Sequence, residues 1–249
     1  MNMFKTGLAS VSFRSLNAEE IIRLTKECGL SAIEWGSDIH APKDNASLLV
    51  RIKELTDEAG LYTSSYGTYF RIGETPAQEL YGYISAAKIL GTKTLRIWCG
   101  RKNYENTGAA EREKIIEEAK DVARIAEDAG VVLGIECHNN TFTSSPEGAL
   151  SLMQGVSSPS LRMYWQPLND EAQNTRYAQK ISQYAVNVHV FNRSQGGKHP
   201  LCEGLDAWQR YLSFFDGTQH LLLEFMPDGL PESLAKEAEA LRLIYKSII

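Results

Sequence analysis

The chain has 249 residues, of which 43% are hydrophobic and 23% charged, and a protein of this length can bury a large core without disulfide bonds. Its formal net charge of −5 gives no basic surface for nucleic acid or an anionic membrane, so we expect neither as a partner. No apolar run of about 18 residues is present, so we predict no transmembrane helix.

The first residues and the cysteines together predict a cytoplasmic protein. The N-terminal residues contain no long apolar run of the kind found in signal peptides. The cysteines stand far apart without a CxxC pair, which is typical of reduced thiols in the cytosol. They are Cys28, Cys99, Cys137 and Cys202.

Helical patterns and apolar runs alternate along the chain. The first helix is predicted to begin at Asn17, whose side chain can cap it together with a glutamate three residues later. Thr75 and Ser145 each precede a proline, and both are predicted to cap later helices. The clearest apolar stripe lies between residues 115 and 126, and the last helix is expected from about Pro231 to the C-terminus.

A repeated glycine signal separates these helices from the runs that follow them. Each of four glycines closes a helical pattern and precedes an apolar run, where a left-handed residue would turn the chain into a strand. They are Gly29, Gly60, Gly91 and Gly130. The predicted strands cover residues 7–13, 32–36, 61–66, 94–100, 131–138, 161–166, 187–191 and 221–225.

Eight strand-then-helix units in about 250 residues favour a (β/α)8 TIM barrel, formed as a single domain by residues 1–249. No predicted strand is followed by GxGxxG, and GxxxxGK[ST] does not occur, so the common nucleotide-binding open sheets find no support. In a TIM barrel the chemistry lies at the C-terminal ends of the strands. We therefore looked for functional residues at these ends.

The fifth predicted strand ends in Glu136 and His138, which lie two residues apart and are expected to share one face. The next three strands end with Gln166, His189 and Glu224, and neighbouring ends lie about 5 Å apart. Two carboxylates, an imidazole and an amide oxygen suit a divalent ion such as Mn²⁺, Mg²⁺, Co²⁺ or Zn²⁺. A satisfied core histidine or a paired glutamate is the alternative for each residue alone, although a charge inside the apolar run at 221–225 is costly unless it is paired or metal-bound.

Other residues at the predicted barrel mouth suit a sugar. Aromatic rings can pack against the apolar face of a sugar, or simply pack the top of the barrel; those near strand ends are Trp35, Tyr66 and Trp98. The polar candidates for substrate contact are His40, His138 and Arg193. The loop 193–200 is also basic and glycine-rich, which is typical either of a phosphate-binding loop or of a plain flexible one.

These groups suggest a reaction on a hydroxy-ketone. A metal ion that holds adjacent oxygens would polarise the carbonyl and acidify the neighbouring C–H. Glu136 and Glu224, on two sides of the substrate, could remove and return the proton. This arrangement predicts isomerisation or epimerisation of a ketose through an enediolate, with a small-molecule sugar as the substrate and with homo-oligomerisation left open.

The strand ends IEWG (33–36), GIECH (134–138), VHV (188–190) and LLEF (222–225) resemble the xylose isomerase-like TIM barrel superfamily. This group includes sugar isomerases and epimerases, inosose dehydratase and endonuclease IV. The resemblance implies that Glu136 and Glu224 are both metal ligands and the acid/base pair, and that His189 is a further ligand. Gln166 departs from the family, which usually has an aspartate there, and a neutral amide is a weaker ligand.

Four alternatives follow from the same residues. An endonuclease IV-like role needs a histidine-rich cluster for three metals, and an acidic chain with five histidines does not fit it. A Schiff-base aldolase needs a lysine inside a strand, and no predicted strand contains one. A metal-dependent dehydratase of an inosose or a keto-sugar acid would use the same ligands as an isomerase. A non-catalytic sugar-binding barrel remains if Gln166 abolishes metal binding, and metal analysis would distinguish it.

Overall fold

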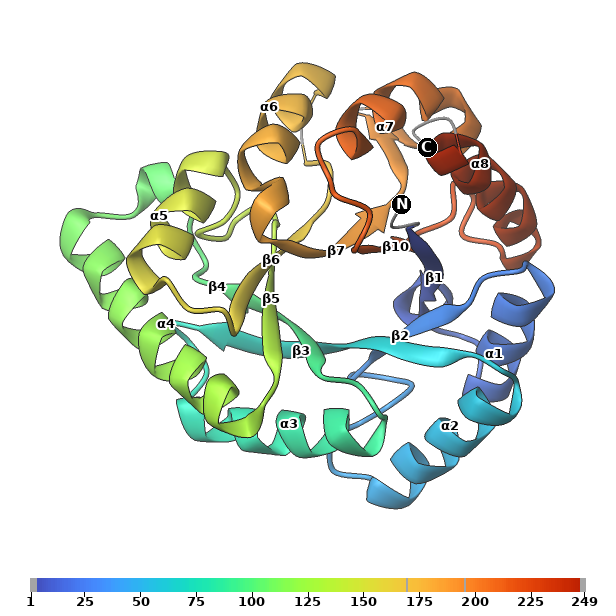
Figure 1. Ribbon diagram of the computed structural model, residues 1–249, viewed down its shortest axis with the longest axis horizontal. Helices are drawn as coiled ribbons and strands as arrows, with labels where there is room; N and C mark the ends of the chain where they lie inside the picture. The colour runs from blue at the N-terminus through green and yellow to red at the C-terminus, as the bar shows by residue number, and fades with distance from the viewer. Residues whose placement is uncertain (1–3, 169, 195, 247–249) are drawn as a thin grey trace.

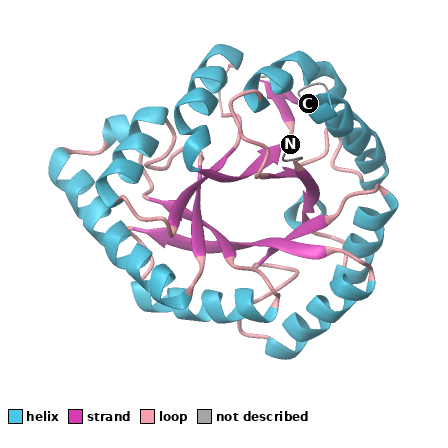
Figure 2. Ribbon diagram, viewed as in Figure 1, coloured by secondary structure: helices cyan, strands magenta, loops and turns pink. Residues whose placement is uncertain are grey.

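Eight parallel strands close into a barrel in the order β1-β10-β7-β6-β5-β4-β3-β2, and eight helices surround it (Figures 1 and 2). The computed structural model describes residues 4–168, 170–194 and 196–246. The barrel strands are β1 (Lys5–Ala9), β2 (Ala32–Gly36), β3 (Tyr62–Ile72), β4 (Thr94–Cys99), β5 (Val132–Glu136), β6 (Leu161–Trp165), β7 (Ala185–Val190) and β10 (His220–Leu223). The helices are α1 (Ala18–Glu27), α2 (Ala46–Glu58), α3 (Leu80–Ile89), α4 (Ala109–Ala129), α5 (Pro146–Val156), α6 (Glu171–Ile181), α7 (Leu205–Leu212) and α8 (Leu234–Lys246). The predicted TIM barrel is confirmed.

The four glycines that mark the helix-to-strand turns all have positive φ angles, between 68° and 79°. This left-handed conformation costs glycine little, and it lets each helix end directly before the next strand. Asn17 caps α1 through a capping box with Glu20, and Ser145 caps α5 by accepting a hydrogen bond from the backbone N–H of Gly148. Local sequence therefore sets the boundaries of these elements.

Some local predictions at the ends of elements were wrong. Residues Ser10–Phe13 form a 3-10 helix rather than the end of β1, and the Ser10 hydroxyl accepts a hydrogen bond from the backbone N–H of Gly36. Thr75 does not cap a helix, because its hydroxyl accepts from the backbone N–H of Arg71. The segment after β7 contains a short antiparallel strand pair, formed by β8 (Asn192–Ser194) and β9 (Gly197–His199), and phosphate binding by this segment stays a prediction.

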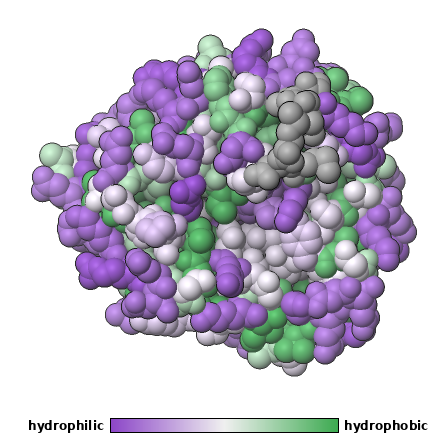
Figure 3. Space-filling view, viewed as in Figure 1, coloured by the Kyte–Doolittle hydropathy of each residue, from purple (hydrophilic) through white to green (hydrophobic). Residues whose placement is uncertain are grey.

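The core lies inside the barrel and between the barrel and its helices. The apolar stripe predicted for α4 is buried there, at Ile115, Ala119, Val122 and Ala126. In the face seen in Figure 3, hydrophilic residues line most of the outer rim, and hydrophobic residues appear between them in smaller areas. Within the described residues, no helix combines the length and the apolar character needed to cross a membrane.

Candidate metal centre and active site

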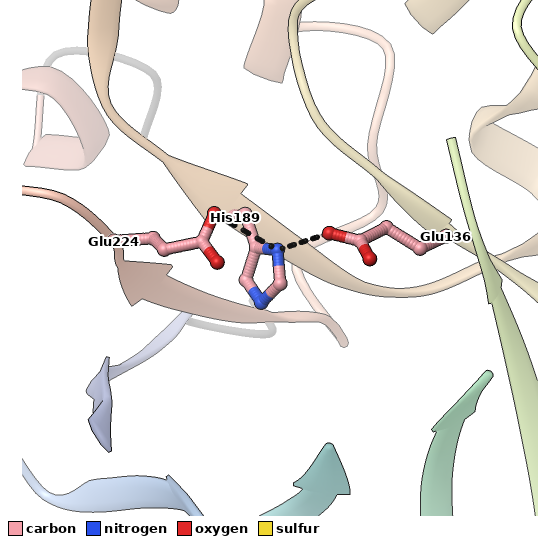
Figure 4. Close-up of side chains that lie close together, drawn as sticks. All are labelled: Glu136, His189 and Glu224. Carbon is pink, nitrogen blue, oxygen red and sulfur yellow. Dashed lines mark hydrogen bonds and ion pairs between the residues drawn. The ribbon is translucent and has the colours of Figure 1, made fainter. Parts of the chain in front are cut away.

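Glu136, His189 and Glu224 meet at the C-terminal ends of β5, β7 and β10 (Figure 4). The two glutamates approach the imidazole from opposite sides. The Nδ1 atom of His189 lies 3.2 Å from Oε1 of Glu136 and 3.4 Å from Oε2 of Glu224. All three side chains are buried, and one ligand atom from each lies within 4.8 Å of the others. The residues placed at three strand ends by the sequence thus form one cluster.

A second pair of charges, absent from the predicted site residues, lies beside this cluster. Arg96, on β4, donates from Nε to Glu34 on β2 at 3.2 Å and from Nη1 to Glu136 at 2.7 Å. A Cβ atom on Gly67 would come within 2.9 Å of both side chains of the Arg96–Glu34 pair, so glycine leaves the room that this ion pair needs. Glu34 and Arg96 each stand inside an apolar strand, and a charge in such a strand is costly unless it is paired or metal-bound, which is the signal that indicates Glu224.

The carboxylate of Glu34 is held ionised. It accepts hydrogen bonds from the hydroxyls of Ser65 and Tyr164, in addition to the bond from Arg96. Burial by itself would raise the pKa of Glu34, but the charges of His189 and Arg96, with the hydrogen bonds, together hold it far below its usual range. Tyr164, in β6, is not among the residues that the sequence predicts for the site.

The two glutamates predicted to form the acid/base pair are not equivalent. Burial raises the pKa of Glu136, but the charge of Arg96 and the contact with His189 outweigh it and lower this pKa to about 2. Burial and the neighbouring carboxylates raise the pKa of Glu224 to about 7. Glu136 therefore stays an anion at neutral pH, whereas Glu224 changes its protonation state near neutrality.

The orientation of His189 suits metal binding. Its Nε2 lies 3.3 Å from Oε1 of Glu34, so a proton on Nε2 would leave the lone pair of Nδ1 between Glu136 and Glu224. When two ligand atoms occupy adjacent coordination positions of one ion, each at about 2.1 Å, they lie roughly 3 Å from each other. The distances from His189 Nδ1 to the two carboxylate oxygens, 3.2 and 3.4 Å, are close to this value.

The charge of the cluster also fits a divalent ion. Three carboxylates and one guanidinium leave a net charge of −2 when the imidazole is neutral. Without an ion, burial lowers the pKa of His189, but the surrounding glutamates outweigh it and raise this pKa to about 10. The donor set therefore fits a divalent cation, and the cluster suggests a metal site of this kind.

Gln166 lies directly after β6 and is buried. Its amide Nε2 donates a hydrogen bond to the backbone carbonyl of Cys137 at 2.8 Å. This bond fixes the orientation of the amide and does not involve the amide oxygen, which is the atom that could bind a metal ion. An amide oxygen is a neutral ligand, so Gln166 remains a proposed fourth ligand that contributes no charge.

Trp98 connects the metal cluster to the barrel mouth. Its indole N–H donates a hydrogen bond to Glu136, and the ring of His138 lies 6.0 Å away in an edge-on arrangement. His138 is exposed, whereas Glu136 is buried. The strand ends at Glu136, and the two side chains come together through Trp98 rather than through a shared strand face. Trp98 and His138 thus lie next to each other beside Glu136, and substrate contact by either stays a prediction.

Three other candidates for substrate contact lie away from the cluster. Glu34 and Ser65 face the barrel interior, so alternation directs Trp35 and Tyr66 toward the surrounding helices, where both are fully buried. The hydroxyl of Tyr66 donates to the backbone carbonyl of Ala41. The remaining one is His40, whose Nε2 lies 3.0 Å from the backbone carbonyl oxygen of Leu16 and which is 5% exposed. The structure does not bring these three to the site, and we assign them no substrate contact.

The hairpin after β7 borders the mouth near Glu224. Arg193 is exposed on it, and Lys198 lies 4.9 Å above the ring of Phe225. Phe225 follows Glu224 directly and has a φ angle of 56°, an unfavourable conformation for a residue other than glycine. Its backbone N–H donates to the hydroxyl of Ser12. Strain of about 1–3 kcal/mol at such a position is typical of functional sites.

A second polar network lies deeper in the barrel. His220, the first residue of β10, contacts the side-chain oxygen of Asn187 through Nδ1 at 2.9 Å and the hydroxyl of Tyr62 through Nε2 at 3.1 Å. Burial, and to a smaller extent the charge of Lys5, lowers the pKa of His220 to about 4. His220 is therefore neutral at neutral pH and has a structural role.

The family model described as xylose isomerase-like TIM barrel matches residues 22–243. No curated protein matches the chain. Among solved structures, a probable 3-DHS dehydratase AsbF from Bacillus anthracis aligns with a TM-score of 0.82 at 17% identity, over 96% of this chain and 99% of that one. A xylose isomerase-like TIM barrel protein from Mycobacterium smegmatis in complex with magnesium aligns with a TM-score of 0.74 at 14% identity, over 99% and 98% of the two chains. A D-allulose 3-epimerase from Methylomonas sp. gives 0.73 at 14% identity, over 100% and 99%. At these identities the alignments show a shared fold.

Proposed function

This chain belongs to the xylose isomerase-like TIM barrel family, and we propose that it is a metal-dependent isomerase or epimerase acting on a ketose or a related sugar. The observation that carries the proposal is the position of His189 Nδ1, 3.2 and 3.4 Å from the carboxylates of Glu136 and Glu224. A divalent ion held there would polarise the substrate carbonyl and stabilise negative charge on its oxygen. Magnesium in one structural relative supports a metal of this class.

In the proposed reaction the two glutamates have different tasks. Among the described residues, no arginine or indole donates a hydrogen bond to Glu224, whose Oε2 lies 3.4 Å from Nδ1 of His189, so its carboxylate is less constrained than that of Glu136 and suits a group that takes a proton from carbon and returns it. Glu136 is held by Arg96 and Trp98, which fix its position and keep it anionic. For epimerisation Glu136 would have to take its turn as the acid on the opposite face. Trp98 and His138 would contact the sugar above the cluster.

We also propose a second candidate, a dehydratase of an inosose or a keto-sugar acid. The unequal contacts of the two glutamates favour it: Arg96 and Trp98 both hold Glu136, whereas Glu224 contacts His189, and elimination of water needs a single group to remove the proton beside the carbonyl. Glu224 would remove that proton, and the same group could then protonate the departing hydroxyl. The dehydratase among the structural relatives is compatible with this chemistry on the same fold.

Exchange with solvent tests both candidates. The protein is incubated with Mg²⁺ in D₂O with a panel of ketoses and inososes, and the products are followed by NMR. An isomerase or epimerase should place deuterium at the carbon beside the carbonyl, and a dehydratase should yield an unsaturated product. Glu224→Gln should abolish both signals while the circular dichroism spectrum stays unchanged. If no sugar of the panel incorporates deuterium or loses water, the enolisation chemistry is rejected.

A further inference from the structure

Arg71 is an unusual cation at the barrel mouth. It lies near the end of β3, paired in register with Trp98 on β4, and its guanidinium carbon is 4.6 Å from the centre of the indole ring. The indole N–H of Trp98 donates to Glu136. One aromatic ring therefore separates this guanidinium from a proposed acid/base residue.

The other arginines and lysines that end neighbouring strands are neutralised by acidic side chains. Arg14 is paired with Asp38, Arg101 with Glu74 and Lys102 with Glu111. Within the described part of the chain, Arg71 has no carboxylate within 4.0 Å. Its guanidinium makes one hydrogen bond to the described residues, from Nη1 to the backbone carbonyl of Gly100 at 2.7 Å, which fixes the group and leaves its other N–H donors free.

The partial burial of the Arg71 side chain distinguishes its charge from the exposed charges nearby. The side chain of Arg71 is partly buried, and burial lowers its pKa, with Arg101 adding to the effect. The cations on the hairpin, Arg193 and Lys198, are exposed and are hydrated by water. Glu74 and Glu136 act on Arg71 only through their charge and form no ion pair with it within 4.0 Å. A carboxylate or a phosphate of a ligand can therefore still bind this partly buried guanidinium through two parallel hydrogen bonds.

We propose that Arg71, stacked on Trp98, binds an anionic group of the substrate, so that the substrate is a sugar acid or a sugar phosphate. This assignment rests on the proposed function only in placing a sugar above the Glu136 cluster. The carboxylate or phosphate would lie on the β3–β4 side of the mouth, while the reacting carbons lie over the cluster. His138, on the other edge of Trp98, would then contact the hydroxyl groups between them.

Binding can be tested without metal or turnover. The ¹⁵N-labelled, EDTA-treated protein is titrated at constant ionic strength with sorbitol, gluconate and sorbitol 6-phosphate, which are neutral, carboxylated and phosphorylated polyols of the same length. The indole N–H signal of Trp98, assigned with Trp98→Phe, is the reporter. It should shift saturably with one or both anions and not with sorbitol, and the two anions distinguish a carboxylate site from a phosphate site.

Variants identify the residue responsible. Arg71→Met should weaken anion binding by about tenfold or more. Arg71→Lys should retain part of the wild-type affinity, because lysine keeps the positive charge but cannot form the two parallel hydrogen bonds of a guanidinium. Arg101→Met, with the same change in charge at a neighbouring but paired arginine, should bind within about twofold of the wild type. An equal shift with sorbitol, no saturable shift, or an equal loss in Arg101→Met would overturn the proposal. If the protein binds gluconate but catalyses no exchange with solvent, the anion site is supported and the proposed isomerase function is rejected.

Discussion

Replacing Arg96 by methionine tests the electrostatic account of the barrel interior. The change removes the guanidinium that pairs with Glu34 and Glu136, so the interior loses one positive charge. At an effective dielectric constant of about 20, pairs at 3.2 and 2.7 Å each contribute roughly 5–6 kcal/mol of gross attraction, which desolvation partly offsets. We expect Arg96→Met to lower the free energy of unfolding by about 3–5 kcal/mol, as is usual when one partner of a buried ion pair is removed.

Urea denaturation followed by circular dichroism measures this loss. The matched control is the double variant Arg96→Met/Glu34→Gln, which loses one positive and one negative charge and so has the same formal interior charge as the wild type. It should recover about half of the lost stability, because only Glu136 is then left without its partner. A loss below about 1 kcal/mol in the single variant, or a double variant no more stable than the single one, would refute the reasoning.

Three further predictions concern metal binding and pH. Glu34→Gln should weaken Mn²⁺ binding about 10–100-fold in calorimetric titrations, because the N–H at Nε2 of His189 would no longer face a carboxylate. The control is Glu237→Gln, which changes a buried glutamate that contacts Leu201 and should leave the Mn²⁺ affinity unchanged. Gln166→Asp adds a negative ligand and should tighten Mn²⁺ binding; an unchanged affinity would show that this side chain is not a ligand. Because the pKa of His220 is lowered to about 4, the unfolded chain binds more protons than the folded one between about pH 4 and 6.5. Stability should therefore fall by up to about 3 kcal/mol as the pH drops through this range, and a His220→Gln variant that shows the same fall would contradict the assignment.

The barrel could be predicted because its signals are local. A glycine after each of four helices and apolar runs at regular spacing require only near neighbours in sequence. The same locality explains the errors at the ends of elements. Residues 10–13 alternate polar and apolar side chains as a strand does, but the Ser10 hydroxyl is used by Gly36 of the next strand. Thr75 has the sequence of a cap, but its hydroxyl is used by Arg71.

The site could be predicted only in part. Glu136, His189 and Glu224 were found because each charge or imidazole ends an apolar strand. The pairing of Glu34 with Arg96 depends on the register across three strands of the barrel, which the sequence does not display. Trp35 stands near the end of its strand, as a residue of the barrel mouth would, but strand alternation directs it to the opposite face from Glu34, where it is buried.

Electron paramagnetic resonance of Mn²⁺ added to the EDTA-treated protein tests most directly whether the three residues form a metal centre. The free-ion signal should disappear until one ion is bound per chain. In His189→Ala, with circular dichroism showing a folded protein, it should persist from the first addition, because the nitrogen between the two glutamates is gone. No bound Mn²⁺ in the wild type, or equally tight binding in His189→Ala, would contradict the metal centre and the chemistry proposed for it.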